Sequence, residues 1–345
     1  MKHFVRPGIR LASLLGGVVV LAALVVGGYF WWSETQPVKY TRSLEKVTIG
    51  VEKSFLPAAV WVAENKGYFE EERLNLTIKE FDSGKASLIA MLNGEGIDIS
   101  AAAPTPIMFS SFVREDFFII STFAYAYEDI KVIANKDSGI NNAEDLKGKK
   151  IGTLMGSTGQ FFTETFLIHN SISPSDVEVV NIAPTDLPEA LKNGHIDAQV
   201  IWEPHGTTAR DLLGDKAIRL PSGKVYKTTF NFLTMKNFAN ENPEILERFL
   251  RGINKATDFL NNNKEESQKI IANRLNLIKE VVALHWDDFT FNLSLDQTFF
   301  INIESEARWA IRNELTDKTK VPNYLEYIYI DALESVKPEA VTIIR

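Results

Sequence analysis

The 345-residue sequence contains no cysteine. This absence excludes disulfide bonds, and it also excludes a membrane anchor built on a lipid-modified N-terminal cysteine. It carries no argument against export, because exported proteins can fold without disulfides. Low-complexity tracts are absent too. After the N-terminal region about 310 residues remain, which is enough for two domains with hydrophobic cores of their own.

A basic stripe is also missing. The net charge is −8 at pH 7 and the sequence pI is near 5.3, so nucleic acid is not expected as a partner. The histidines are dispersed, without the His-x-x-x-His spacing of a metal site, and no Gly-x-Ser-x-Gly motif supplies a nucleophile. No glycine-rich loop continues into the Gly-Lys-Ser/Thr of a P-loop. We therefore expect no catalytic residues, no bound metal and no cofactor.

The N-terminus carries a long uncharged run, Leu11–Trp32, which follows three basic residues. At about 1.5 Å rise per residue this run can cross the ~30 Å hydrocarbon core of a membrane. The basic residues favour a cytoplasmic N-terminus, and the aromatic cluster at the far end is typical of a membrane interface. A cleaved signal peptide is the alternative, although its apolar region is usually shorter. We expect residues 1–32 to anchor the protein at the outer face of the cytoplasmic membrane, with a polar linker over 33–44.

Two segments of the chain, Leu92–Asp98 and Leu191–Asp197, repeat one pattern. In each, an apolar helical run stops at Asn-Gly, where glycine can take the left-handed conformation that ends a helix. A strand then begins at Ile-Asp and leads into a distinctive loop, Ala102–Pro106 or Trp202–Pro204. Two similar α/β units predict two lobes that face one cleft, which is a place to hold a small molecule.

Strand and helix patterns alternate along the next part of the chain. Apolar or alternating runs predict strands, and longer apolar runs behind capping residues predict helices. The predicted strands are 47–51, 74–81, 97–100, 117–123, 131–134, 151–155, 177–180 and 198–202, and the predicted helices are 55–65, 83–92, 105–113, 142–146, 156–169 and 187–192. This alternation predicts the α/β class, with mainly parallel sheets and helices on both faces.

The last third of the chain differs from the rest. Residues 229–235 are predicted to form a strand that returns to the first lobe, and Asn242-Pro243-Glu244 marks the start of the first of several helices. The first lobe is therefore predicted to be discontinuous, with 45–128 plus 226–345 surrounding a second lobe at 129–225. Two crossings between the lobes would make a hinge.

Several segments resemble a known family. Glu144–Gly152, Gly156–Thr158, Ala190–Ala198 and Trp202–Pro204 occur in the same order in the solute-binding proteins for nitrate, sulfonates, taurine and thiamine-precursor pyrimidines. The resemblance runs from about Val47 to Phe259, and it implies a two-lobed periplasmic binding protein fold of the double-crossover (type II) kind. One relative in the broader family is a pyrimidine-forming enzyme with a cysteine cluster, which this chain lacks.

The resemblance also implies a function. The protein would be the extracytoplasmic substrate-binding protein of an ABC importer, with the permease and its ATPase as partners. It would capture a small organic or inorganic anion, such as a sulfonate, taurine or nitrate, by hinge closure. Two alternatives stay open: a membrane-tethered sensor with the same cleft, and a receptor for a thiamine-precursor pyrimidine.

Candidate ligand contacts lie in loops that follow predicted strands, at the sheet edge where α/β proteins bind ligands. Gly156, Ser157 and Thr158 open a helix whose N–H groups can hold an anion, unless the hydroxyls only cap the helix. Trp202 offers a flat wall and Glu203 an acceptor, unless they pack in the core and start the next helix. The remaining candidates, chosen by their position, are Lys53, Ser54, Ser83, Gly84, Ala103, Thr105, Tyr127 and Asn231.

Overall fold

The structure is a computed structural model that describes residues 44–344. The predicted anchor at 11–32 and almost all of the predicted linker lie outside the described residues. Among residues 44–344 no helix is both long and apolar enough to cross a membrane.

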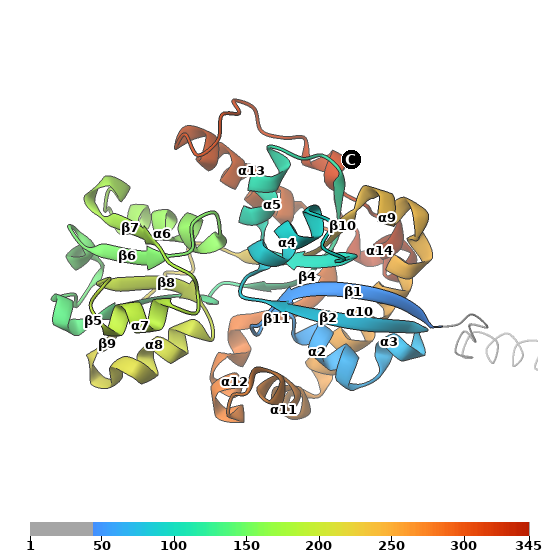
Figure 1. Cartoon of the computed structure of the whole chain (residues 1–345), viewed down its shortest axis with the longest axis horizontal. Coiled ribbons are helices and arrows are strands. Elements are labelled where there is room, and N and C mark those ends of the chain that lie inside the picture. Colours follow the sequence, from blue (N-terminus) through green and yellow to red (C-terminus); the bar gives the residue numbers. More distant parts are fainter. Residues whose placement is uncertain (1–43, 345) are drawn as a thin grey trace, which may run out of the picture. The chain divides into compact units, whose positions relative to one another are not determined.

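One sheet has six strands and is assembled from two separate stretches of sequence (Figure 1). Its order is β11-β4-β10-β3-β1-β2. The strands are β1 (Glu45–Glu52), β2 (Leu74–Phe81), β3 (Ile99–Ala102), β4 (Phe117–Ala126), β10 (Thr228–Met235) and β11 (Phe289–Ser294). The predicted returning strand is β10, which lies between β3 and β4 and pairs antiparallel with both.

The other sheet has five strands, all from the stretch of chain between β4 and β10. Its order is β7-β6-β8-β5-β9. The strands are β5 (Ile130–Asn135), β6 (Lys150–Thr153), β7 (Glu178–Asn181), β8 (Ala198–Trp202) and β9 (Ala217–Leu220). The chain therefore passes from the six-stranded sheet to the five-stranded sheet after β4 and returns before β10.

The prediction of mainly parallel sheets is wrong. Of the nine strand pairings among the described residues, four are parallel and five are antiparallel. Parallel neighbours need a crossover connection, usually a helix. The chain passes from β4 of one sheet to β5 of the other through only Tyr127–Asp129, without a helix. β5 and β10, the strands that follow the two crossings, pair antiparallel with their neighbours.

Helices cover both faces of each sheet (Figure 1). Beside the five-stranded sheet lie α6 (Thr158–His169) on one face and α7 (Leu187–Lys192) and α8 (His205–Leu213) on the other. The remaining helices accompany the six-stranded sheet. They are α2 (Ala58–Asn65), α3 (Tyr68–Glu71), α4 (Gly84–Leu92), α5 (Pro104–Ser111), α9 (Lys236–Glu241), α10 (Pro243–Asn262), α11 (Lys264–Leu275), α12 (Lys279–His285), α13 (Gln297–Arg312) and α14 (Asp331–Val336).

The repeated Asn-Gly pattern forms the predicted helix ends. Gly94 follows α4 with a φ of +75°, and Gly194 follows α7 with a φ of +72°. A side chain is strained in this left-handed region, so glycine allows the chain to turn sharply into β3 and β8. Both strands then carry their following loops toward the same region, the predicted cleft.

An aromatic cluster fixes the six-stranded sheet to its helices. The Phe232 ring on β10 stacks on that of Phe123 with 4.0 Å between centroids, and it meets the Phe249 ring of α10 edge-on at 4.9 Å. Phe249 in turn stacks on Phe69 of α3 at 5.7 Å. Burying a phenylalanine side chain stabilises a fold by about 1.5–3 kcal/mol. This cluster therefore holds the returning strand firmly in the sheet.

Candidate ligand-binding site

A pocket lies between the two sheets, at the ends of β1, β3 and β8 and beside the start of α6. Its walls come from residues beside both sheets and from the first crossing between them. They are formed by Glu52, Leu56, Ser83, Gly84, Lys85, Ala103, Pro106, Asp129, Ile130, Ser157, Thr158, Trp202, Thr228 and Phe230. The cavity between these walls measures about 20 Å³, room for roughly one water molecule. An organic ligand can enter only if the walls separate.

Six of the predicted contact residues line this pocket. The six-stranded side contributes Ser83, Gly84 and Ala103, and the five-stranded side contributes Ser157, Thr158 and Trp202. The pocket therefore joins loops that lie far apart in the sequence, as the repeated pattern predicted.

Three other predicted residues, Lys53, Tyr127 and Asn231, do not line the pocket. Lys53 is exposed, with its Nζ 3.9 Å from Oε2 of Glu80. Tyr127 is 42% exposed and meets Tyr125 edge-on. The side-chain amide of Asn231 donates to the Ala102 carbonyl, and its oxygen accepts a hydrogen bond from Thr122, so this side chain ties β10 to its two neighbouring strands.

Three further predicted residues also lie outside the pocket lining, and each takes part in a hydrogen bond. The Ser54 hydroxyl donates to Oε1 of Glu52 at 2.8 Å. The Thr105 hydroxyl donates to Oγ1 of Thr158 at 3.3 Å, which links α5 to α6 across the boundary between the sheets. The Gly156 N–H donates to Oε1 of Gln160, and Gly156 has a φ of +70°.

The Ser157 side chain caps the start of α6. Oγ of Ser157 accepts a hydrogen bond from the Gly159 N–H at 3.1 Å, and the same hydroxyl donates to the Leu154 carbonyl at 2.7 Å. The Ser157 hydroxyl therefore caps the helix, as the alternative interpretation in the sequence analysis had it. Thr158 differs, because its Oγ1 accepts from Thr105 and its own hydroxyl proton stays available to the pocket.

Glu52 caps the start of α4, and the sequence analysis did not identify it. Its Oε2 accepts a hydrogen bond from the Gly84 N–H at 2.9 Å, while Oε1 accepts from Ser54. Burial raises the pKa of Glu52, and these two hydrogen bonds oppose the rise. A carboxyl of the chain itself thus occupies the N-terminus of α4, a position that would otherwise suit a bound anion.

Asp129 is a second buried acidic residue of the pocket wall. It lies in the first crossing between the sheets and is only 2% exposed. Burial raises its pKa well above the usual range, the charges of Glu52 and Glu203 raise it further, and Lys131 opposes them. Among the described residues, Oδ1 of Asp129 has no hydrogen-bond partner. An unpaired buried acceptor of this kind costs free energy unless a ligand or water satisfies it.

Lys85 bridges the two walls. It lies in the first turn of α4, and its Nζ donates to the Met155 carbonyl at 2.7 Å. Burial lowers the pKa of Lys85. Its ammonium lies against Gly156, where a Cβ atom would come within 2.7 Å of Nζ. Glycine at 156 therefore leaves the space through which Lys85 reaches the opposite wall.

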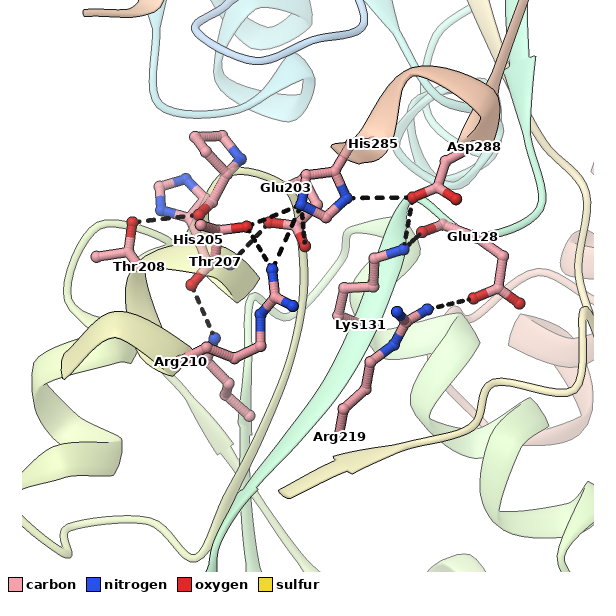
Figure 2. A network of polar contacts seen from close by, with 12 residues as sticks. Glu128, Lys131, Glu203, His205, Thr207, Thr208, Arg210, Arg219, His285 and Asp288 are labelled. Atoms are coloured by element: carbon pink, nitrogen blue, oxygen red, sulfur yellow. Dashed lines mark hydrogen bonds and ion pairs between the residues drawn. The ribbon is translucent and has the colours of Figure 1, made fainter. Parts of the chain in front are cut away.

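Glu203 belongs to a different polar network, beside the pocket (Figure 2). It is fully buried, and its Oε2 accepts a hydrogen bond from the Thr207 N–H at 2.8 Å, which fits the alternative that it starts α8. His285 lies between Thr207 and Asp288, with Nε2 2.9 Å from the Thr207 hydroxyl and Nδ1 3.2 Å from Oδ2 of Asp288. Asp288 also pairs with Lys131 of β5 at 2.8 Å. This network, from Glu203 to Lys131, connects the five-stranded sheet to the segment that precedes β11.

Comparison with known proteins identifies the family. The sequence profile described as NMT1/THI5 like matches residues 57–267, more than half of the chain. The chain belongs to this family. A relative in Bacillus subtilis (strain 168), named as a putative aliphatic sulfonates-binding protein, is 29% identical over 246 residues, which cover 70% of this chain and 73% of that protein. The taurine-binding periplasmic protein of Escherichia coli (strain K12) is 27% identical over 210 residues, 59% of this chain and 63% of that protein.

A solved structure supports the same conclusion about the fold. The crystal structure of the periplasmic aliphatic sulphonate binding protein SsuA from Escherichia coli matches with a TM-score of 0.70 and 21% identity, over 83% of this chain and 98% of that chain. At this identity the likeness concerns the fold, which is the mixed α/β fold of periplasmic binding proteins. The family resemblance inferred from the sequence motifs is therefore confirmed.

Proposed function

We propose that the protein is the extracytoplasmic substrate-binding component of an ABC importer and not an enzyme. Its ligand would be a small organic acid of the sulfonate or taurine class. One observation carries this proposal: a pocket with walls from both sheets holds a lysine, Lys85, opposite the N-terminus of α6. An ammonium group and a helix N-terminus both attract an acidic group. The names of the two relatives, one for sulfonates and one for taurine, support the same ligand class.

Hinge closure is the second part of the proposal. Residues 45–128 plus 226–344 would form one lobe and 129–225 the other, with the two crossings as the hinge. The 20 Å³ cavity is too small for an organic acid, so the ligand would bind an open form and favour the closed one. The closed pair of lobes would then be the surface that the permease recognises.

The third part concerns the membrane. We propose that residues 11–32, which are uncharged over their whole length, stay attached to the protein as an anchor. The protein should then sediment with membranes and resist extraction by alkaline carbonate. N-terminal sequencing of the exported protein decides the matter, since a chain that begins near Tyr29 would contradict the anchor.

Binding is tested directly by calorimetry on the purified full-length protein in detergent. The panel contains taurine, ethanesulfonate, longer alkanesulfonates, nitrate and an aminomethylpyrimidine. A ligand at about 100 times its Kd should raise the free energy of unfolding by ~2.7 kcal/mol. If neither taurine nor any of the other sulfonates binds, the proposed ligand class is wrong.

Closure is tested by a distance measurement. Because the chain has no cysteine, Glu95→Cys and Ser175→Cys can place spin labels on exposed positions in the two proposed lobes without removing any native thiol. The ligand should narrow the distribution of distances between the labels and shift its mean. An unchanged distribution at saturating ligand would argue for a rigid scaffold.

A further inference from the structure

The acidic residues of the pocket pose a problem for a purely anionic ligand. Glu52 and Asp129 both line the pocket and both are buried, whereas Lys85 is the one basic residue among its lining residues. Once ionised, two buried carboxyls repel an anion that brings no positive charge of its own. A ligand with both a negative and a positive end would not meet this repulsion.

Of the two carboxyls, Asp129 is the one with an oxygen that lacks a partner, although a backbone N–H of Glu203 also bonds this carboxyl. Glu52 is occupied, since one oxygen accepts from Ser54 and the other from the Gly84 N–H. Oδ1 of Asp129 is buried without a hydrogen-bond partner among the residues that the structure describes. A buried carboxyl oxygen that lines a pocket in this state is an acceptor in need of a donor.

The lysine nearest to Asp129 in sequence does not fill this role. The Lys131 ammonium donates to the Glu128 carbonyl and to Oδ2 of Asp288 at 2.8 Å, outside the pocket. Lys85 donates to the Met155 carbonyl on the opposite wall. The positive charge that would favour ionised Asp129 is therefore missing from the pocket wall and can come from a ligand.

We infer that the ligand is a small zwitterion whose ammonium group binds Asp129, with Glu52 as a second negative neighbour, while its acidic group faces Lys85 and the N-terminus of α6. This inference rests on the proposed function and adds the group that distinguishes an amino acid or aminosulfonate from a plain anion. On binding, Lys85 exchanges the Met155 carbonyl for the acidic group of the ligand. The ammonium donates to Oδ1 of Asp129, so both charged side chains gain a charged partner at once.

A matched pair of ligands tests the inference. Taurine and ethanesulfonate share the two-carbon sulfonate skeleton and differ in the ammonium group. Calorimetry on the full-length protein should show taurine binding roughly ten- to a hundredfold more tightly, the expected range for one charged hydrogen bond. β-Alanine and propionate repeat the comparison with a carboxylate as the acidic group.

An isosteric variant assigns the ammonium to one residue. Asp129→Asn removes the negative charge and keeps the size, so taurine should lose roughly tenfold or more in affinity while ethanesulfonate is unchanged or improved. Asp215→Asn, the same change at an exposed position, is the control and should leave both ligands unaffected. If Asp129→Asn does not fold, the comparison of the two ligands on the unaltered protein still decides the central point.

The possible outcomes separate this inference from the proposed function. Equal affinity for taurine and ethanesulfonate would overturn the inference and leave the proposed function standing. The inference also fails, and the proposed function stands, if Asp129→Asn weakens both ligands equally. If no member of either pair binds, the inference fails, and the proposed ligand class fails with it when the longer alkanesulfonates do not bind either. Preference for taurine that disappears in Asp129→Asn supports both.

Discussion

Nζ of Lys131 lies 2.8 Å from Oδ2 of Asp288, and this ion pair connects the two sheets. Lys131 is on β5 of the five-stranded sheet, and Asp288 directly precedes β11 of the six-stranded sheet. Burial disfavours ionisation of Asp288, but hydrogen bonds from His285 and Lys131 outweigh it and hold the pKa of Asp288 below its usual value. The pair therefore favours the arrangement of the two sheets that this structure has.

We expect Asp288→Asn to loosen this arrangement. The variant leaves the buried Lys131 ammonium without its charged partner, so the free energy of unfolding should fall by about 1–3 kcal/mol in urea denaturation. In the ligand-free protein, the spin-label distance distribution should also broaden. Asp287→Asn is the matched control, because the Asp287 side chain is 87% exposed and pairs with an exposed lysine, Lys264. Equal behaviour of the two variants would mean that the Lys131 pair does not restrain the sheets.

Removing each of the two hydroxyl groups at the start of α6 should have a different effect on ligand binding. Ser157→Ala removes the helix cap and should cost about 1 kcal/mol of stability. Thr158→Val keeps the side-chain shape but removes a donor that faces the pocket and the acceptor of the buried Thr105 hydroxyl, so taurine binding should weaken about tenfold or more and the free energy of unfolding should fall by about 1–3 kcal/mol. Calorimetry and urea denaturation measure the two effects. Normal binding by Thr158→Val would show that its hydroxyl does not contact the ligand.

Most of the architecture follows from local sequence patterns. Helix starts such as Asn142 and Ser83 were recognisable because each side chain caps a helix in the structure, and Gly94 and Gly194 were recognisable as helix ends. β11 also alternates, with buried Phe289, but its strand signal was overlooked among the predicted helices of the last third. Strand direction could not be predicted in this way, because it depends on which sheet each strand joins.

The candidate site could be predicted only in part, for a physical reason. Loops at strand ends were found by position, and they supplied Ser83, Thr158 and Trp202. Glu52 and Asp129 were missed because an acidic residue at a strand end or in a crossing is usually exposed to solvent. Their roles arise from burial against the opposite wall, which no local pattern encodes. The position of Lys85, directly after Ser83 and Gly84, was the available signal for that residue.

Trp202 combines two roles that the sequence analysis treated as alternatives. Its side chain is 6% exposed, packs in the core of the five-stranded sheet and also lines the pocket. Trp202→Ala should therefore lower the free energy of unfolding by about 3–5 kcal/mol and also abolish binding. Trp202→Phe keeps most of the packing and should cost less stability, so it isolates the effect on binding. If Trp202→Phe binds taurine as tightly as the unaltered protein, the indole ring makes no specific contact with the ligand.

Glu306 of α13 is fully buried and accepts a hydrogen bond from the hydroxyl of Tyr226, just before the chain re-enters the six-stranded sheet at β10. Burial raises the pKa of Glu306 to about 7, although the hydrogen bond from Tyr226 opposes the rise. Between pH 4.5 and about 7, Glu306 therefore keeps its proton in the folded protein but has released it in the unfolded chain. This difference makes stability depend on pH in a definite direction.

Because the pKa of Glu306 is higher in the folded state, its contribution to stability is fully present below pH ~4.5 and is lost as the pH rises to about 7. The loss should amount to about 3 kcal/mol at most, and it should level off above neutral pH. Position 306 cannot ionise in the Glu306→Gln variant. As the pH rises across this range, the unaltered protein should therefore lose stability relative to the variant. Urea denaturation from pH 5 to 8 measures it, with Glu304→Gln as the control, since the Glu304 side chain is 42% exposed. Parallel pH profiles for Glu306→Gln and the unaltered protein would show that Glu306 ionises normally in the folded state.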